Sequence, residues 1–249
     1  MRSSNIFLSS CVLGMVLAAP AANADTWSLG ASAAIEMYPY KDVDNDVLPF
    51  PMIGYEGDNF FFRGAVAGTY LWKDAENQLS LDVYYSPLHF RPSKSDDHQM
   101  KQLDKRRSTM MGGIGYKHIA DWGILRTSIA ADMLNTSNGL RAEGAYLYAF
   151  NIDNLKLTPG VGVSWYSSNF NDYYYGISGH ESRRSGLEQY NAGSSWSPYA
   201  ELTANYRFNP NWSAFATGRY TRLDSEVKDS PMVDKSYTAL IATGITYTF

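Results

Sequence analysis

Apolar and polar positions alternate along most of this chain, and the alternation is clearest near its C-terminus. Between residues 237 and 249 the odd positions form a mostly apolar row, whereas the even positions are small and mostly bear hydroxyl groups. A period of two places the rows on opposite faces of a β-strand, so each face meets a different environment. The segment is about as long as a bilayer crossing and has aromatic residues at both ends, which is typical of a transmembrane β-barrel strand.

The final residues carry a second pattern. Phe249 ends the chain, Tyr247 lies two residues before it, and Gly244 lies three residues before that. This arrangement resembles the terminal signal by which Gram-negative outer-membrane barrels are recognised for assembly. The chain is therefore expected in the outer membrane of a Gram-negative cell.

The same alternation recurs throughout residues 25–249 and predicts a single all-β domain, an antiparallel transmembrane β-barrel. Eleven segments can be counted, but bacterial barrels usually have an even number of strands, so we predict 10–12 strands and prefer 12. The missing crossing lies either within 47–72, where 59–72 has room for a tight pair, or at 173–178. The counted segments cover about residues 26–38, 47–55, 60–72, 78–90, 107–118, 122–134, 140–150, 155–167, 196–208, 211–223 and 236–249.

The connections between these segments are of two lengths. The short ones are rich in Asn, Asp, Gly and Pro, the residues of tight turns, and the longer ones are polar. In outer-membrane barrels the short turns face the periplasm and the long loops face outwards. Short turns are expected at 56–59, 73–77, 120–122, 151–154 and 209–211, and long loops at 39–46, 92–105, 167–194 and 224–235.

The N-terminus predicts export. Arg2 is followed by an apolar run at 12–20 and by the A-N-A cleavage pattern at 22–24, so residues 1–24 read as a secretory signal peptide. A lipoprotein signal ending at Cys11 is the less favoured alternative, because the main apolar run follows that cysteine instead of preceding it. Since Cys11 is the only cysteine, we expect the mature chain to contain no disulfide.

Composition agrees with a barrel and narrows the range of functions. The chain contains 19 tyrosines, yet its mean hydropathy is polar, as expected when half of each strand faces a wet lumen. The net charge is −4 and no basic stripe is present, so a nucleic-acid partner is not expected.

No catalytic, cofactor or metal site is predicted. The histidines His89, His98, His118 and His180 are scattered and lack metal-ligand spacing, so they are expected at the surface or rim. The acidic run at 42–46 has the alternating carboxylates of a calcium loop, but the required glycine and closing glutamate are missing. Solvated loop charge is the favoured interpretation, and we expect the protein not to be an enzyme.

Two loop clusters are candidates for contact with partners. Lys105, Arg106 and Arg107 precede a predicted strand and are suited to lipopolysaccharide phosphates. The second cluster combines aromatic rings with guanidinium groups; such tyrosines form either a contact surface or part of the aromatic girdle at the membrane interface, and the sequence leaves both open. Its members are Tyr173, Tyr174, Tyr175, Arg183 and Arg184.

A set of short blocks runs through most of the chain. The blocks are P-Y-K-D at 39–42, Y-E-G-D-N at 55–59, F-F-R-G at 61–64, R-S-T-M-M at 107–111, S-N-G at 137–139, L-T-P-G-V-G at 157–162, Y-Y-Y-G at 173–176, S-G-L at 185–187, S-W-S-P-Y at 195–199, R-Y-T-R-L at 219–223 and D-S-P-M-V-D-K at 229–235. Each block alone is unspecific, but together they resemble the MipA/OmpV family of outer-membrane proteins.

The resemblance implies a non-catalytic scaffold that links a murein lytic transglycosylase to a bifunctional penicillin-binding murein synthase in cell-wall biogenesis. It carries over no binding residue. Murein enzymes work in the periplasm, where this topology offers mainly short turns, so either the partner grips a small rim or some loops are reversed. A small pore and an outward-facing adhesin that uses residues 92–105 and 168–194 stay open as alternatives.

Overall fold

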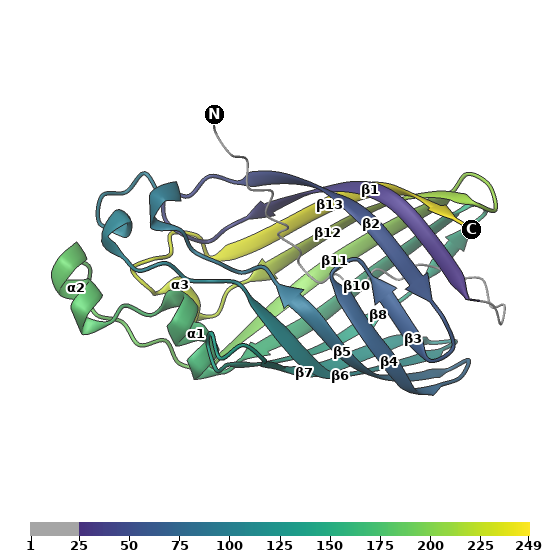
Figure 1. Ribbon diagram of the computed structural model, residues 1–249, viewed down its shortest axis with the longest axis horizontal. Coiled ribbons are helices and arrows are strands. Elements are labelled where there is room, and N and C mark those ends of the chain that lie inside the picture. Colours follow the sequence, from purple (N-terminus) through teal and green to yellow (C-terminus); the bar gives the residue numbers. More distant parts are fainter. Residues whose placement is uncertain (1–24) are drawn as a thin grey trace.

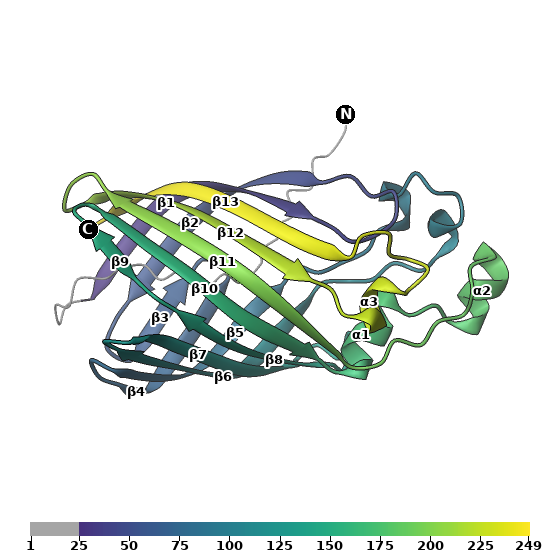
Figure 2. The ribbon, with the colours of Figure 1, turned by 180° about the vertical axis from the view of Figure 1, so that it is seen from behind.

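A computed structural model describes residues 25–249, which form a closed antiparallel β-barrel (Figures 1 and 2). The predicted signal peptide at 1–24 lies outside the described residues. The strand segments are β1 Thr26–Met37, β2 Asp46–Glu56, β3 Phe60–Arg63, β4 Val66–Lys73, β5 Asn77–Ser86, β6 Thr109–Ala120, β7 Gly123–Asp132, β8 Leu140–Leu147, β9 Phe150–Ile152, β10 Leu155–Tyr166, β11 Ser195–Arg207, β12 Trp212–Arg222 and β13 Tyr237–Thr248.

The barrel has twelve strands. Apart from β8 and β9, each segment pairs with its neighbours in the chain, β1 pairs with β13, and the pairing of β10 with β11 completes the ring. β8 and β9 pair with successive parts of β10 and so make up one interrupted crossing. With an even number of strands, the N- and C-termini both lie at the side of the barrel that carries the short turns. The odd count of eleven segments is thereby corrected to twelve strands.

The uncounted strand lies where one of the two predictions placed it. β3 and β4 form a tight hairpin, turned at Gly64 in a left-handed conformation with φ of 62°. The alternative strand at 173–178 is wrong, because helix α1 (Ser168–Tyr175) occupies its first half and the remainder belongs to no strand. Its N-cap residue Ser167 accepts a hydrogen bond from the amide of Phe170, which stabilises the first helical turn.

The alternation predicted for the last strand is confirmed. On β13, the odd-numbered Ile241 is 54% exposed, whereas Leu240 and Ala242 are buried inside. Ala34 on the neighbouring β1 is also buried and packs with this inner row. The apolar row therefore faces the lipid and the row of smaller residues faces the lumen, as a membrane barrel requires.

The long loops fold together into a cap over one end of the barrel, made of residues 38–45, 87–108, 167–194 and 223–236. It contains α1, α2 (Gly179–Ser185), α3 (Ser225–Lys228) and the short 3₁₀ turns Pro92–Lys94 and Met100–Gln102. Figure 1 shows the α-helices at the end opposite the C-terminus. Among residues 25–249, no helix is long and apolar enough to span a membrane. The buried core of the cap consists of Tyr38, Tyr40, Phe90, Met100, Leu103, Phe170, Tyr174, Tyr175, Ile177, Leu223, Val227 and Met232.

Candidate functional site

Five charged side chains meet inside the barrel, on the wall that β7, β8, β11 and β12 form. Glu143 on β8 pairs with Arg141 at 2.8 Å, Arg219 at 3.1 Å and Arg126 at 3.3 Å. Glu201 on β11 pairs with Arg126 at 2.9 Å and with Arg219 at 3.2 Å. We call these five residues the charged network; all of them lie on the inward rows of their strands.

Neutral groups complete the surroundings of Glu143. The hydroxyl of Tyr199 donates to its Oε1 at 2.9 Å and that of Ser164 to its Oε2 at 3.3 Å. The guanidinium carbon of Arg219 lies 3.6 Å from the centroid of the Tyr199 ring. These hydrogen bonds to Glu143 help to offset the cost of burying its charge. Three guanidinium groups against two carboxylates leave the network with one excess positive charge.

Apolar side chains fill the lumen beside the charged network. Met52 on β2 packs with Phe215 and Leu240, with Phe50 against them. Further round the wall, β5, β6 and β7 contribute a second buried apolar group that includes Tyr84. Apolar and charged side chains are therefore neighbours inside the lumen, and β12 carries both Phe215 and Arg219.

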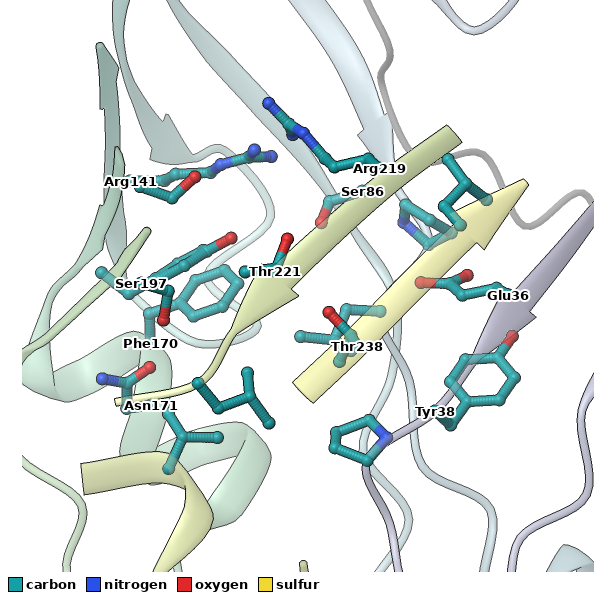
Figure 3. A pocket seen from close by; sticks show the side chains of 18 of the residues that line it. Glu36, Tyr38, Ser86, Arg141, Phe170, Asn171, Ser197, Arg219, Thr221 and Thr238 are labelled. Atoms are coloured by element: carbon teal, nitrogen blue, oxygen red, sulfur yellow. The ribbon is translucent and has the colours of Figure 1, made fainter. Parts of the chain in front are cut away.

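A cavity of about 130 Å³ lies between the charged network and the cap. Arg141 and Arg219 border it from the network, and Glu36 and Tyr38 border it from β1 and the chain just beyond (Figure 3). Tyr84, near the C-terminal end of β5, also lines the cavity. The cavity thus combines guanidinium groups, a carboxylate and aromatic rings within one partly open space.

A buried ion pair ties the cap together. Arg106 donates to Glu181 at 2.8 Å, and the two side chains are 9% and 4% exposed. The amides of Asp104 and Ser178 also donate to Glu181, at 2.9 and 3.0 Å. Burial works to raise the pKa of Glu181, but these amides and Arg106 outweigh it and hold that pKa below its ordinary value. Glu181 is therefore a carboxylate that joins two of the long loops.

Comparison with known proteins assigns the family. The family model of MltA-interacting protein MipA matches residues 29–249. The chain belongs to this family. The MltA-interacting protein of Escherichia coli (strain K12) is 53% identical over 245 residues, which cover 97% of this chain and 99% of the relative.

More distant MipA-type proteins are named for the outer membrane. Outer membrane protein OmpV of Vibrio cholerae serotype O1 is 25% identical over 209 residues, covering 84% of this chain and 81% of its own. Among solved structures, an outer membrane channel from Pseudomonas putida F1 is 11% identical, covers 93% of this chain and 97% of its own, and has a TM-score of 0.44. The predicted MipA/OmpV membership is confirmed, and this MipA-family barrel is an outer-membrane protein.

The structure divides the residues predicted as partner contacts into two groups. Arg106, Tyr174 and Tyr175 are buried in the cap, so they do not form a surface, and the expectation of contact is wrong for these three in this conformation. Arg106 donates a hydrogen bond to Glu181, and the hydroxyl of Tyr174 donates one to the carbonyl of Arg107. Lys105, Arg107, Arg183 and Arg184 are exposed and Tyr173 is half-buried, so for these five residues contact with a partner stays a prediction.

The predicted assembly residues lie at the short-turn end and along β13. Phe249 is 68% exposed, and its ring lies 5.0 Å from that of Tyr247. Gly244 has no room for a side chain, because a Cβ there would lie 2.6 Å from the Phe215 ring and 2.7 Å from the carbonyl of Ala31. Their recognition during assembly stays a prediction.

Sequence reasoning missed the charged network. Its members come from four strands, and only the register of the sheet brings them together. The available signal was a charged residue at an inward-facing position of an alternating strand, as at Glu143 and Glu201. Among residues 25–249, no group of three His, Cys, Asp or Glu side chains is placed to bind a metal.

Proposed function

We propose that this protein is an outer-membrane scaffold that binds a murein lytic transglycosylase. The observation that carries the proposal is the 53% identity, over nearly the full length of both chains, to a relative named MltA-interacting protein. The family resemblance adds a bifunctional penicillin-binding murein synthase as the second partner. We also propose that the protein has no catalytic activity of its own.

A filled lumen supports a scaffold more than a pore. A solute moving along the barrel axis would have to pass the cap and then the charged network, in which Glu143 and Glu201 hold three guanidinium groups. The cap has its own core, to which Tyr40, Met100 and Met232 contribute fully buried side chains. Such packing favours a rigid body over an open channel.

We place the partner's contact at the short-turn end. The long loops are committed to the cap, whereas the short turns face the periplasm, where murein enzymes work. Exposed carboxylates dominate these turns and suit a basic surface on the enzyme. The cationic Lys73 at this end already forms a salt bridge with Glu56 at 3.0 Å. The exposed turn carboxylates are Asp58, Asp74, Glu76, Asp121 and Asp153.

Binding of a purified lytic transglycosylase to this barrel in lipid nanodiscs tests the proposal. We expect saturable binding that weakens when these five turn carboxylates are changed to the matching amides, and that also weakens as salt shortens the Debye length below about 10 Å. The matched control changes three exposed carboxylates of the cap, Asp44, Asp96 and Glu188, in the same way, and should bind as the parent does. Binding lost only in the cap variant would place the partner at the other end, and no binding by any form would exclude the scaffold.

The opposite end carries a separate expectation. Lys105 and Arg107 are exposed at the cap, and we propose that they pair with lipopolysaccharide phosphates. Neutralising both residues should reduce lipopolysaccharide co-purification while leaving transglycosylase binding intact. Unchanged co-purification would remove this partner.

A further inference from the structure

One stretch of the barrel wall is incomplete. β2 pairs with β1 along its whole length, but it pairs with β3 only over residues 54–56. The β3–β4 hairpin then turns at Gly64, whose amide donates to the carbonyl of Ile53 at 2.9 Å. Figure 1 shows this hairpin ending part-way along the barrel. Residues 46–52 of β2 therefore have no strand on their second edge within the described chain.

The free edge of β2 is built to remain without a partner. The carbonyl of Ile53 faces β3, so the main-chain groups of Val47, Pro49 and Pro51 face the same edge, because neighbouring residues of a strand alternate. Proline has no N–H, and only Val47 therefore presents a donor there. Within hydrocarbon an unsatisfied donor costs several kcal/mol, so two prolines make an open edge tolerable.

The opening is bordered by β2, by a turn and by two loops, and we call it the window. β2 forms one side and the turn at 64–65 the lower edge, with the amide of Tyr85 on β5 donating to the carbonyl of Ala65 at 3.1 Å. Above, the loop after β1 meets the loop after β5. Val43 bridges to Ser95 and Lys41 pairs with Asp97 at 2.7 Å. The window thus lies in the cap-side half of the wall.

The interior behind the window is amphipathic. Phe50 and Met52 of β2 point inwards beside the free edge and pack with Phe215 and Leu240. The lumen also holds the guanidinium groups of Arg141 and Arg219, and the cavity that they line extends to Glu36 and to Tyr84 near the end of β5. The Nε of Arg219 is buried and has no hydrogen-bond partner. A molecule that entered from the lipid would meet apolar side chains first and then cationic groups.

We propose that the lumen binds an anionic amphiphile with an acyl chain, which enters from the lipid phase through the window. Its phosphate or carboxylate head lies against Arg141 and Arg219, on the side of the cavity formed by the charged network. Its chain lies along Phe50 and Met52 and leaves through the window. A dry cavity of about 150 Å³ holds benzene, so the 130 Å³ here suffices for the head group and the first carbons.

Photolabelling of the full barrel tests this assignment. The probe is tetradecyl phosphate with a diazirine near the head group, added to the protein in nanodiscs of phosphatidylcholine, with labelled residues identified by mass spectrometry. We expect label on the inward Phe50, Met52 and Tyr84. Label confined to outward residues such as Ile53 and Val83 would overturn the proposal, because the probe would then only coat the barrel.

Two comparisons test the role of charge. Changing Arg141 and Arg219 together to glutamine should lower inward labelling about tenfold, the loss expected for one charge-assisted hydrogen bond. The matched control, Arg222→Gln, alters an exposed residue at the end of β12 and should leave labelling unchanged. A second comparison uses the parent protein and replaces the phosphate probe with the matching tetradecyl alcohol, which should label the inward residues less. Equal inward labelling by phosphate and alcohol would refute recognition of an anion.

Discussion

Removing the carboxylate of Glu181 is a direct perturbation of the cap. Glu181 is 3% exposed and accepts hydrogen bonds from Arg106 and from the amides of Asp104 and Ser178. Glu181→Ala leaves the buried guanidinium of Arg106 with two carbonyl acceptors but no carboxylate to balance its charge, and breaking a buried ion pair in this way costs about 3–5 kcal/mol. We expect this cost to fall on opening of the cap, because the strands of the barrel do not depend on these contacts.

Amide hydrogen exchange in nanodiscs measures that cost locally. Protection of the cap amides should fall by about two to four powers of ten in Glu181→Ala, while the strand amides keep theirs. Glu188→Ala, an exposed position in the same long loop, is the matched control and should change little. Adding Arg106→Met to Glu181→Ala should restore part of the protection, since it removes the stranded charge. Equal protection in the Glu181 and Glu188 variants would refute the reasoning.

Three further predictions follow from particular contacts. Folding lowers the pKa of Glu181, so its carboxylate contributes fully to cap stability above the unfolded-state pKa of about 4.3. This contribution is lost as the pH falls through the lowered pKa of the folded state, and hydrogen exchange of the cap amides measured against pH would show the loss. Glu143→Ala should lower the free energy of unfolding of the barrel by about 3–5 kcal/mol in urea titrations, against little change for Glu76→Ala at an exposed turn position. Gly244→Ala should slow folding, measured by heat-modifiable gel migration, because its Cβ would meet Phe215. Gly218→Ala, with 3.9 Å to its nearest neighbour, should fold normally.

Local patterns in the sequence predict most of the barrel, because each strand reports its own two environments. The alternation on β13 is correct residue by residue, and the two lengths of connection mark the two ends. The β3–β4 hairpin was harder to identify, since β3 has only four residues and the turn at Gly64 interrupts an apparently continuous segment.

The interior of the barrel and the cap lie beyond such reasoning. Glu143 and Glu201 are 58 positions apart in the chain, and they meet through Arg126 and Arg219 only after the sheet has set its register. Tyr174 and Arg106 look like surface residues in a polar loop, but packing of several loops buries them. The window likewise depends on where the hairpin stops, although the pair Pro49 and Pro51 was a visible signal of an open edge.

Affinity capture from detergent-solubilised envelopes is the most direct test of the central claim, that this outer-membrane barrel is a scaffold for murein enzymes. With the tagged parent protein as bait, we predict retention of a lytic transglycosylase and, through it or beside it, a penicillin-binding murein synthase. Bait with neutral short turns should retain less of both, although it reaches the outer membrane in equal amount. Capture of neither enzyme by the parent protein would contradict the account.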